Sequence, residues 1–165
     1  MKNKFILILI ASVLFSGQLA CQKQEDKQTP QELARQLFVG VKDSKTTPAI
    51  ISALIKAGAE VNATNSDGMS PLMMAAWTNS NPEVLATLIK ARAEVNATNS
   101  DGMSPLMWAA KTNSNPEVLA TLIKAGAEVN ATNSDGKKAI DYAKENDALK
   151  DTDVYWQLHD ASFEE

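Results

Sequence analysis

The chain has 165 residues, a formal net charge of −4 at pH 7 and a single cysteine. One cysteine excludes an intramolecular disulfide, so packing alone must stabilise the fold. A moderately acidic chain without clusters of lysine and arginine argues against nucleic acid as a partner.

The N-terminus has the pattern of an export signal. Lys2 and Lys4 give a positive start, the apolar run 5–15 follows, and small or neutral residues continue to Ala20. This run is too short to predict a transmembrane helix. We therefore expect residues 1–20 to be an export signal. Its removal takes away Lys2 and Lys4, so the net charge moves from −4 to −6.

The only cysteine lies directly after this segment. Leu19-Ala20-Cys21 resembles the processing site of a bacterial lipoprotein, although Gln18 departs from that pattern. The resemblance implies lipidation of Cys21 and anchoring to a bacterial membrane, facing the periplasm. Residues 21–29 would then be the lipid-anchor cysteine and a flexible polar tether. Two alternatives stay open: an uncleaved anchor, or a free thiol beside an ordinary cleavage site in a soluble periplasmic or secreted protein.

Two helices are predicted directly after the tether. Thr29-Pro30-Gln31-Glu32 has the form of a capping box with proline at the first helical position. It predicts a helix over Gln31–Lys42, and Ala49–Lys56 is predicted to be the second helix of the same unit.

The centre of the chain is an internal repeat. Glu60–Ala93 and Glu94–Ala127 follow each other with a period of 34 residues and differ at only three positions. Weaker copies flank them at 47–66 and 128–146. Self-similarity at such a period is typical of a stacked array, which offers an extended surface rather than a reaction pocket.

Within each copy the local signals indicate helix, turn, helix and loop. Ser70-Pro71 and Asn81-Pro82 each supply a capping side chain and a proline at the first helical position. The second helix carries a predicted buried stripe at Val84, Leu85, Leu88 and Ile89. Asp153–Asp160 is expected to be the closing helix, with Val154 and Leu158 inward and charge outward.

These residues resemble the ankyrin repeat. The family pattern is a D-G turn, T-P-L-H, paired alanines, an apolar second helix and G-A-D-V-N. It is matched in order by Asp67-Gly68, Ser70-Pro71-Leu72-Met73, Ala75-Ala76, Val84 to Ile89 and Ala93-Glu94-Val95-Asn96. Two features depart from it: the period is one residue longer than the usual 33, and Met73 and Met107 replace the histidine.

The resemblance implies an all-α repeat fold, an α-solenoid of about four helix-turn-helix repeats with finger-like turns. The expected domain spans residues 30–162, with repeats at about 30–62, 63–96, 97–130 and 131–162. The two central repeats are near-identical, and the terminal repeats would act as caps.

In the ankyrin family a partner protein binds the concave face, which the first helices and the turn tips line. By alignment, the expected partner-binding residues are Met69, Met74, Trp77, Thr78, Met103, Trp108, Lys111 and Thr112. Two of the three differences between the copies fall here, Met74 against Trp108 and Trp77 against Lys111. Tryptophan and methionine are enriched at interfaces. The alternative is drift after duplication, with the tryptophans packed between helices.

These features predict a protein–protein interaction module of the bacterial cell envelope, monomeric and without a cofactor. Catalysis is not expected, because His159 is the only histidine and no zinc or nucleophile set can be assembled around it. The alternative is an envelope ligand or metal carrier, with Cu(I) as the concrete candidate, that uses the thioethers of Met69, Met73, Met74, Met103 and Met107.

Three further features have structural interpretations. Asn62, Asn96 and Asn130 match a glycosylation pattern but are expected to be loop asparagines. The turn 64–68 resembles a calcium loop but lacks the acidic ligands. Arg92 takes the place of Gly126, just after a helix, where a left-handed backbone is expected.

Overall fold

The structure is a computed structural model that describes residues 28–163, so the expected export signal and Cys21 lie outside its described part. Residues 28–163 form eight α-helices and no strand. The helices are α2 (Pro30–Lys42), α3 (Pro48–Lys56), α4 (Pro71–Thr78), α5 (Pro82–Lys90), α6 (Pro105–Thr112), α7 (Pro116–Lys124), α8 (Ala139–Ala143) and α9 (Asp153–Ala161). This confirms the predicted all-α repeat.

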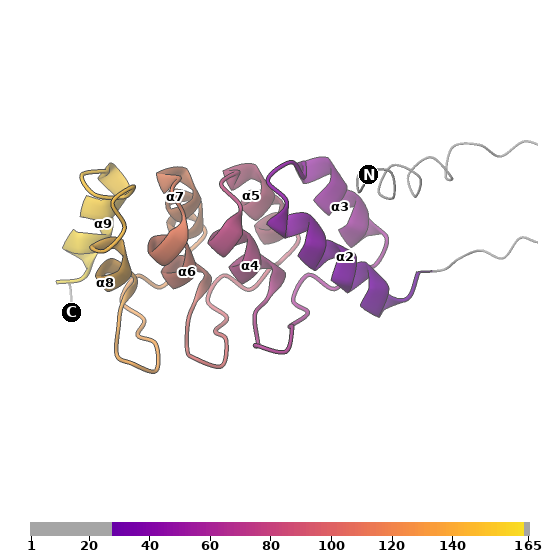
Figure 1. The fold of residues 1–165 in the computed structure, drawn as a ribbon, viewed down its shortest axis with the longest axis horizontal. Coiled ribbons are helices and arrows are strands. Elements are labelled where there is room, and N and C mark those ends of the chain that lie inside the picture. The colour runs from indigo at the N-terminus through magenta and orange to yellow at the C-terminus, as the bar shows by residue number, and fades with distance from the viewer. Residues whose placement is uncertain (1–27, 164–165) are drawn as a thin grey trace, which may run out of the picture.

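The helices stand in two rows (Figure 1). The first helices of the four pairs, α2, α4, α6 and α8, form one row, and the second helices, α3, α5, α7 and α9, form the other. Three loops project from the first row to the same side, and we call them fingers 1, 2 and 3 (residues 62–70, 96–104 and 130–138). None of the helices among residues 28–163 combines the length and apolar character that a membrane span requires.

The helix starts follow from proline and a side-chain cap. Pro71 opens α4, and the Ser70 hydroxyl accepts a hydrogen bond from Met73 N at 3.3 Å. Pro82 opens α5, and the Asn81 side chain accepts a hydrogen bond from Glu83 N at 3.0 Å. These acceptors satisfy N–H groups that have no partner inside the helix. The first two helices and α9 differ from the predicted bounds by one residue at one end only.

The core lies between the two rows. Three of the four residues in the predicted stripe, Val84, Leu85 and Leu88 of α5, have no exposed surface, and their equivalents in α7 are equally buried. The fourth residue, Ile89, is only half-buried, so the prediction was wrong there. Ala75 and Ala76 of α4 are also fully buried. Their small side chains let the first helices approach each other more closely than the second helices do.

Buried asparagines join the ends of successive first helices. Asn113 donates from Nδ2 to the carbonyls of Ala76 and Asn79, at 2.9 and 3.0 Å, across to the preceding repeat. Asn146 makes the same pair of bonds one repeat later, to Ala110 and Asn113, both at 3.0 Å. Asn79 in turn donates to the end of α2. We call this series the inner carboxamide ladder; it satisfies last-turn carbonyls that no helical N–H reaches.

A second series lies at the ends of the second helices α5, α7 and α9, which belong to the row that we call the outer row. Asn62 donates to the carbonyl of Arg92 at 3.2 Å and accepts from Glu94 N at 3.0 Å. Asn96 and Asn130 donate to the ends of the next outer helices, at 3.1 and 2.8 Å. This outer carboxamide ladder agrees with the structural interpretation of these loop asparagines.

The fingers are held in shape by a third set of asparagines. Asn99 Oδ1 accepts from Asp101 N at 3.1 Å and from Met103 N at 2.8 Å, and Asn65 and Asn133 make the same two bonds in their own fingers. The oxygen that the calcium interpretation would use as a ligand therefore holds the turn instead.

Neighbouring fingers also pack on each other. Ser134 N donates to the carbonyl of Asp101 at 3.0 Å, which joins fingers 2 and 3. Gly102 lies between them with φ +74°, and a Cβ there would be 2.9 Å from Ser134 N. Only glycine meets both demands, the left-handed backbone and the close approach.

The closing helix differs from the expectation in part. Val154 and Leu158 of α9 are buried as predicted. The outer side is not only charged, however, because Trp156 is 48% exposed and Phe163, just after the helix, is 74% exposed. The prediction of an outward face of charge was therefore wrong for this end of the array.

The inner carboxamide ladder leads to a prediction about Asn113→Ala. Asn113 is 4% exposed, so its loss leaves two buried carbonyls without a donor, and we expect a cost of about 2–3 kcal/mol in the free energy of unfolding. Asn146→Ala removes the same pair of bonds at a half-buried site and should cost less. Urea unfolding measures both, and equal small losses would contradict the ladder's role.

Arg92 leads to a second prediction. Its φ is +67°, whereas the equivalent Gly126 has φ +90°. A side chain in the left-handed region is strained, so Arg92→Gly should raise the free energy of unfolding by about 1 kcal/mol. Gly126→Arg is the matched control, since a Cβ at Gly126 meets no atom within 4 Å and only backbone strain can act. An unchanged or lower unfolding midpoint for Arg92→Gly would contradict the inference that the backbone at Arg92 is strained.

Candidate partner-binding surface

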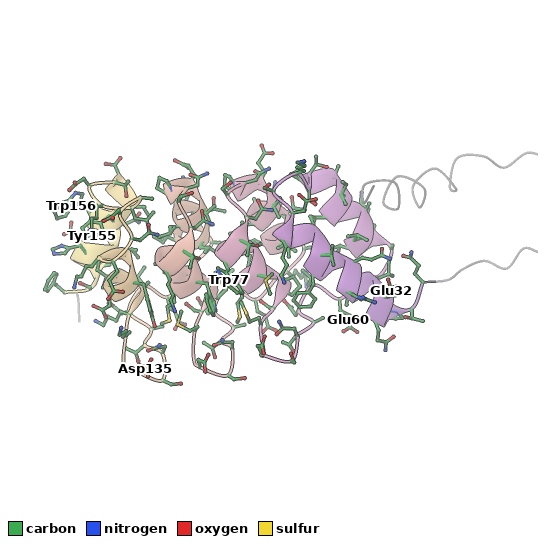
Figure 2. All side chains as sticks on the ribbon, viewed as in Figure 1. Glu32, Glu60, Trp77, Asp135, Tyr155 and Trp156 are labelled. Carbon is green, nitrogen blue, oxygen red and sulfur yellow. The ribbon has the colours of Figure 1, made fainter. Side chains whose placement is uncertain are left out.

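The first helices and the three fingers together form one side of the array, which we call the finger face. It corresponds to the concave face on which partner-binding residues were predicted. Trp77 lies in the last turn of α4, near the middle of the array (Figure 2). Asp135 lies in finger 3 (Figure 2).

Two tryptophans from successive repeats stack here. The ring centroids of Trp77 and Trp108 are 5.1 Å apart, and their planes meet at 30°. Trp77 is 38% exposed and covers Trp108, which is only half-buried. Trp77 and Trp108, which stand at two of the three positions where the copies differ, are therefore in contact across the boundary between α4 and α6.

The stack continues into the last repeat as cation–π contacts. Lys111 Nζ lies 5.5 Å from the ring centroid of Trp108 and 5.5 Å from that of Tyr142. Lys137 Nζ, from finger 3, lies 5.5 Å from the Tyr142 centroid. A lysine over a ring face is attracted by the negative face of the ring. We call Trp77, Trp108, Lys111, Tyr142 and Lys137 the aromatic–lysine row.

One rule describes the row. The residue near the end of one first helix covers an aromatic ring of the next first helix: Trp77 covers Trp108, and Lys111 covers Tyr142. Tyr142 stands one 34-residue period after Trp108, so extending the repeat frame into α8 would have found it in the sequence. The sequence analysis missed Tyr142 and Lys137 because the last copy has diverged.

The polar groups of the row are mostly donors. Lys111 and Lys137 are exposed. Within residues 28–163, the indole N–H of Trp108 is the one buried side-chain polar group without a hydrogen-bond partner. A buried donor without an acceptor is uncommon in proteins. The row thus offers ring faces and N–H groups to a partner.

The two threonines contribute to the frame as well as to the surface. Both are exposed. The Thr112 hydroxyl lies 3.1 Å from the Trp77 carbonyl and 3.0 Å from the Trp108 carbonyl, so it spans the repeat boundary. The Thr78 hydroxyl donates to the Met74 carbonyl at 2.9 Å.

Three predicted contact residues are not accessible. Met69, Met74 and Met103 are only 3%, 3% and 4% exposed, which corrects the expectation that they are adaptable surface contacts. Met103 shows the reason, because Asn133 from the next finger contacts its sulfur at 3.6 Å. Stacked fingers enclose side chains that would be exposed on a single finger.

The Cu(I)-carrier alternative finds no support. Met73 and Met107 are each 1% exposed, and the other three methionines are buried as just described. Thioethers that pack in the core cannot gather around an ion without unfolding the repeats. In the part of the chain that the structure describes, no group of three His, Cys, Asp or Glu side chains is arranged to hold a metal.

An open depression extends the finger face at its N-terminal end. It has a volume of about 470 Å³ and lies between α2 and finger 1. Its lining includes Phe38 beside the charged side chains of Arg35 and Glu60. This mixed lining could receive an extended side chain of a partner, and it contains no reactive pair.

Comparison with known proteins agrees with the geometry. A sequence model of ankyrin repeats, three copies long, matches residues 37–133 and again residues 72–152. Together these matches cover more than half of the chain. No match is found among curated proteins.

Proposed function

Because the chain belongs to the ankyrin-repeat family, whose repeats generally mediate protein–protein interaction, we propose that it binds another protein non-covalently through its finger face. The observation that carries the proposal is the aromatic–lysine row, which exposes an indole and two ammonium groups on that face. The family is typically a non-enzymatic interaction module.

Within the row, we assign different roles to different residues. Trp77 and Lys111 are exposed and would contact the partner directly. Trp108 packs against Trp77 and would support the surface, and its indole N–H is buried. Exposed aromatic residues in a preformed surface tend to carry much of the binding energy.

The ladders support binding without rearrangement. Inner and outer asparagines fix each repeat against the next at both helix ends. A surface whose backbone is already ordered loses little conformational entropy on binding. The proposed mechanism is therefore docking on a rigid surface.

We also propose that the protein acts at the bacterial cell envelope, tethered by a lipid on Cys21. The support is the export-signal pattern of residues 1–20 and the Leu19-Ala20-Cys21 sequence. The polar segment 22–29 would separate the lipid from α2. The partner would then be another envelope protein or a protein that enters the envelope.

The finger-face proposal predicts the behaviour of Trp77→Ala combined with Lys111→Ala. In a pull-down from the envelope fraction, followed by titration of the captured partner, we expect at least about tenfold weaker binding, because truncated hot-spot residues cost on the order of 2 kcal/mol each. The matched control is Lys90→Ala combined with Lys124→Ala, which alters two exposed lysines of the outer row. A partner that both double variants retain equally would refute the finger-face assignment.

The anchor proposal predicts the behaviour of Cys21→Ser. Without the thiol no lipid can be attached, so the variant should leave the membrane fraction while the wild type stays in it. Cell fractionation with immunodetection measures the distribution. A Cys21→Ser chain that remains in the membrane fraction would point to an uncleaved anchor instead.

A further inference from the structure

The C-terminal end of the array carries four aromatic rings in one cluster. His159 lies at its centre, with ring centroids 5.5 Å from Trp156, 5.0 Å from Phe163 and 6.4 Å from Tyr155. Tyr155 also meets Trp156 edge to face at 5.3 Å. We call this the α9 aromatic face. Figure 2 shows Trp156 and Tyr155 at the opposite end of the array from Glu32 of α2.

This end of a repeat array is expected to be polar. A terminal repeat has no further repeat to cover it, so its outer side normally carries polar residues that keep the protein soluble. Here Trp156 and Phe163 are 48% and 74% exposed. A single exposed apolar residue needs no explanation, but a contiguous aromatic patch marks an interaction surface.

The α9 aromatic face is held in place from behind. Asn130, in the outer carboxamide ladder, donates to the Ala161 carbonyl at 2.8 Å. Lys138 Nζ reaches the Ser162 carbonyl at 3.3 Å, and the Ser162 hydroxyl donates to the His159 carbonyl at 2.6 Å. These bonds fix the end of α9 just before Phe163, so the rings need little ordering when a partner binds.

The charges around the cluster are negative. Asp151, Asp153 and Asp160 are exposed. Two cations lie nearby, and both already have partners. Lys138 donates to the Ser162 carbonyl behind the cluster. Lys150 donates a hydrogen bond to Asp147 and thereby lowers the pKa of that carboxyl and raises its own pKa. Ring faces and carboxylates attract the same kind of group, a cation.

The negative charge of these carboxylates distinguishes between the possible binding partners of the α9 aromatic face. A second copy docked on the same face would bring like charges together, which disfavours a dimer. Anionic lipid would be repelled by the same carboxylates. A positively charged segment gains from both the carboxylates and the ring faces, and arginine in particular stacks on aromatic rings.

We propose that the α9 aromatic face is a second binding surface, separate from the finger face, that receives a basic amphipathic segment of a partner protein. Lysine or arginine side chains of that segment lie over the rings and near Asp153 and Asp160. Its apolar side chains cover Trp156 and Phe163. The protein then has two surfaces of different chemistry, one rich in donors and one acidic and aromatic.

The test is selection of random twelve-residue peptides displayed on phage, with the purified full chain as bait. Peptides selected on the wild type should be enriched in lysine and arginine. Synthetic copies of them should bind the Trp156→Ala/Phe163→Ala chain at least about tenfold more weakly, since aromatic anchors dominate such interfaces. Asp153→Asn/Asp160→Asn should weaken binding and reduce its dependence on salt. Trp77→Ala, on the finger face, is the matched control and should leave the affinity unchanged.

Several results would overturn the inference. Peptides without an excess of cations, or without any loss of affinity in the α9 variants, would exclude a basic segment. Sedimentation of a dimer that Trp156→Ala dissociates would make a second copy the occupant, and binding to phosphatidylcholine vesicles that Trp156→Ala abolishes would make it a membrane. If the Trp77→Ala/Lys111→Ala chain loses the partner while the α9 variants retain both the partner and the peptides, the finger-face proposal stands and the α9 proposal is refuted.

Discussion

The buried hydrogen bond from an asparagine carboxamide to the carbonyls of the preceding repeat is the interaction on which the array depends. Every first helix ends with carbonyls that lack a helical donor, and at the end of α4 these carbonyls are buried at a repeat boundary. Asn113, 4% exposed, satisfies two of them at once and accepts a bond from Asn115 N at 3.0 Å. Because a carboxamide has both a donor and an acceptor side, one residue fixes the turn and the boundary together.

The asparagine bonds fix how each first helix lies against the next, and this arrangement places the side chains of the finger face. With each first helix fixed against the next, the last-turn residue of one repeat lies over the ring of the following repeat. Trp77 over Trp108 is followed one repeat later by Lys111 over Tyr142, and the first of these pairs joins two positions at which the copies differ. The differences between the copies are therefore coupled by packing. Recognition and packing are not competing explanations of Trp77, which is in the stack and 38% exposed at the same time.

The two ends of the array are not equivalent. The N-terminal end begins with a polar helix and an open depression between α2 and finger 1. The C-terminal end closes on aromatic rings that no further repeat covers, with Trp156 and Phe163 on its outer side. An α9 that only capped the array would need Val154 and Leu158 inward and polar groups outward. The exposed rings are the extra feature, and they give this end its own binding chemistry.

The sequence by itself determined the repeat, its helices and the buried stripe of the second helices, because period, capping residues and apolar spacing are local properties. It also determined the left-handed backbone at Arg92, since the equivalent position in the next copy is glycine. Exposure was decided only by the tertiary structure. Met103 is buried because the next finger reaches it, and Trp108 is half-buried because Trp77 covers it. Which side chains remain at a surface depends on the neighbouring repeat, and no single repeat of the sequence contains that information.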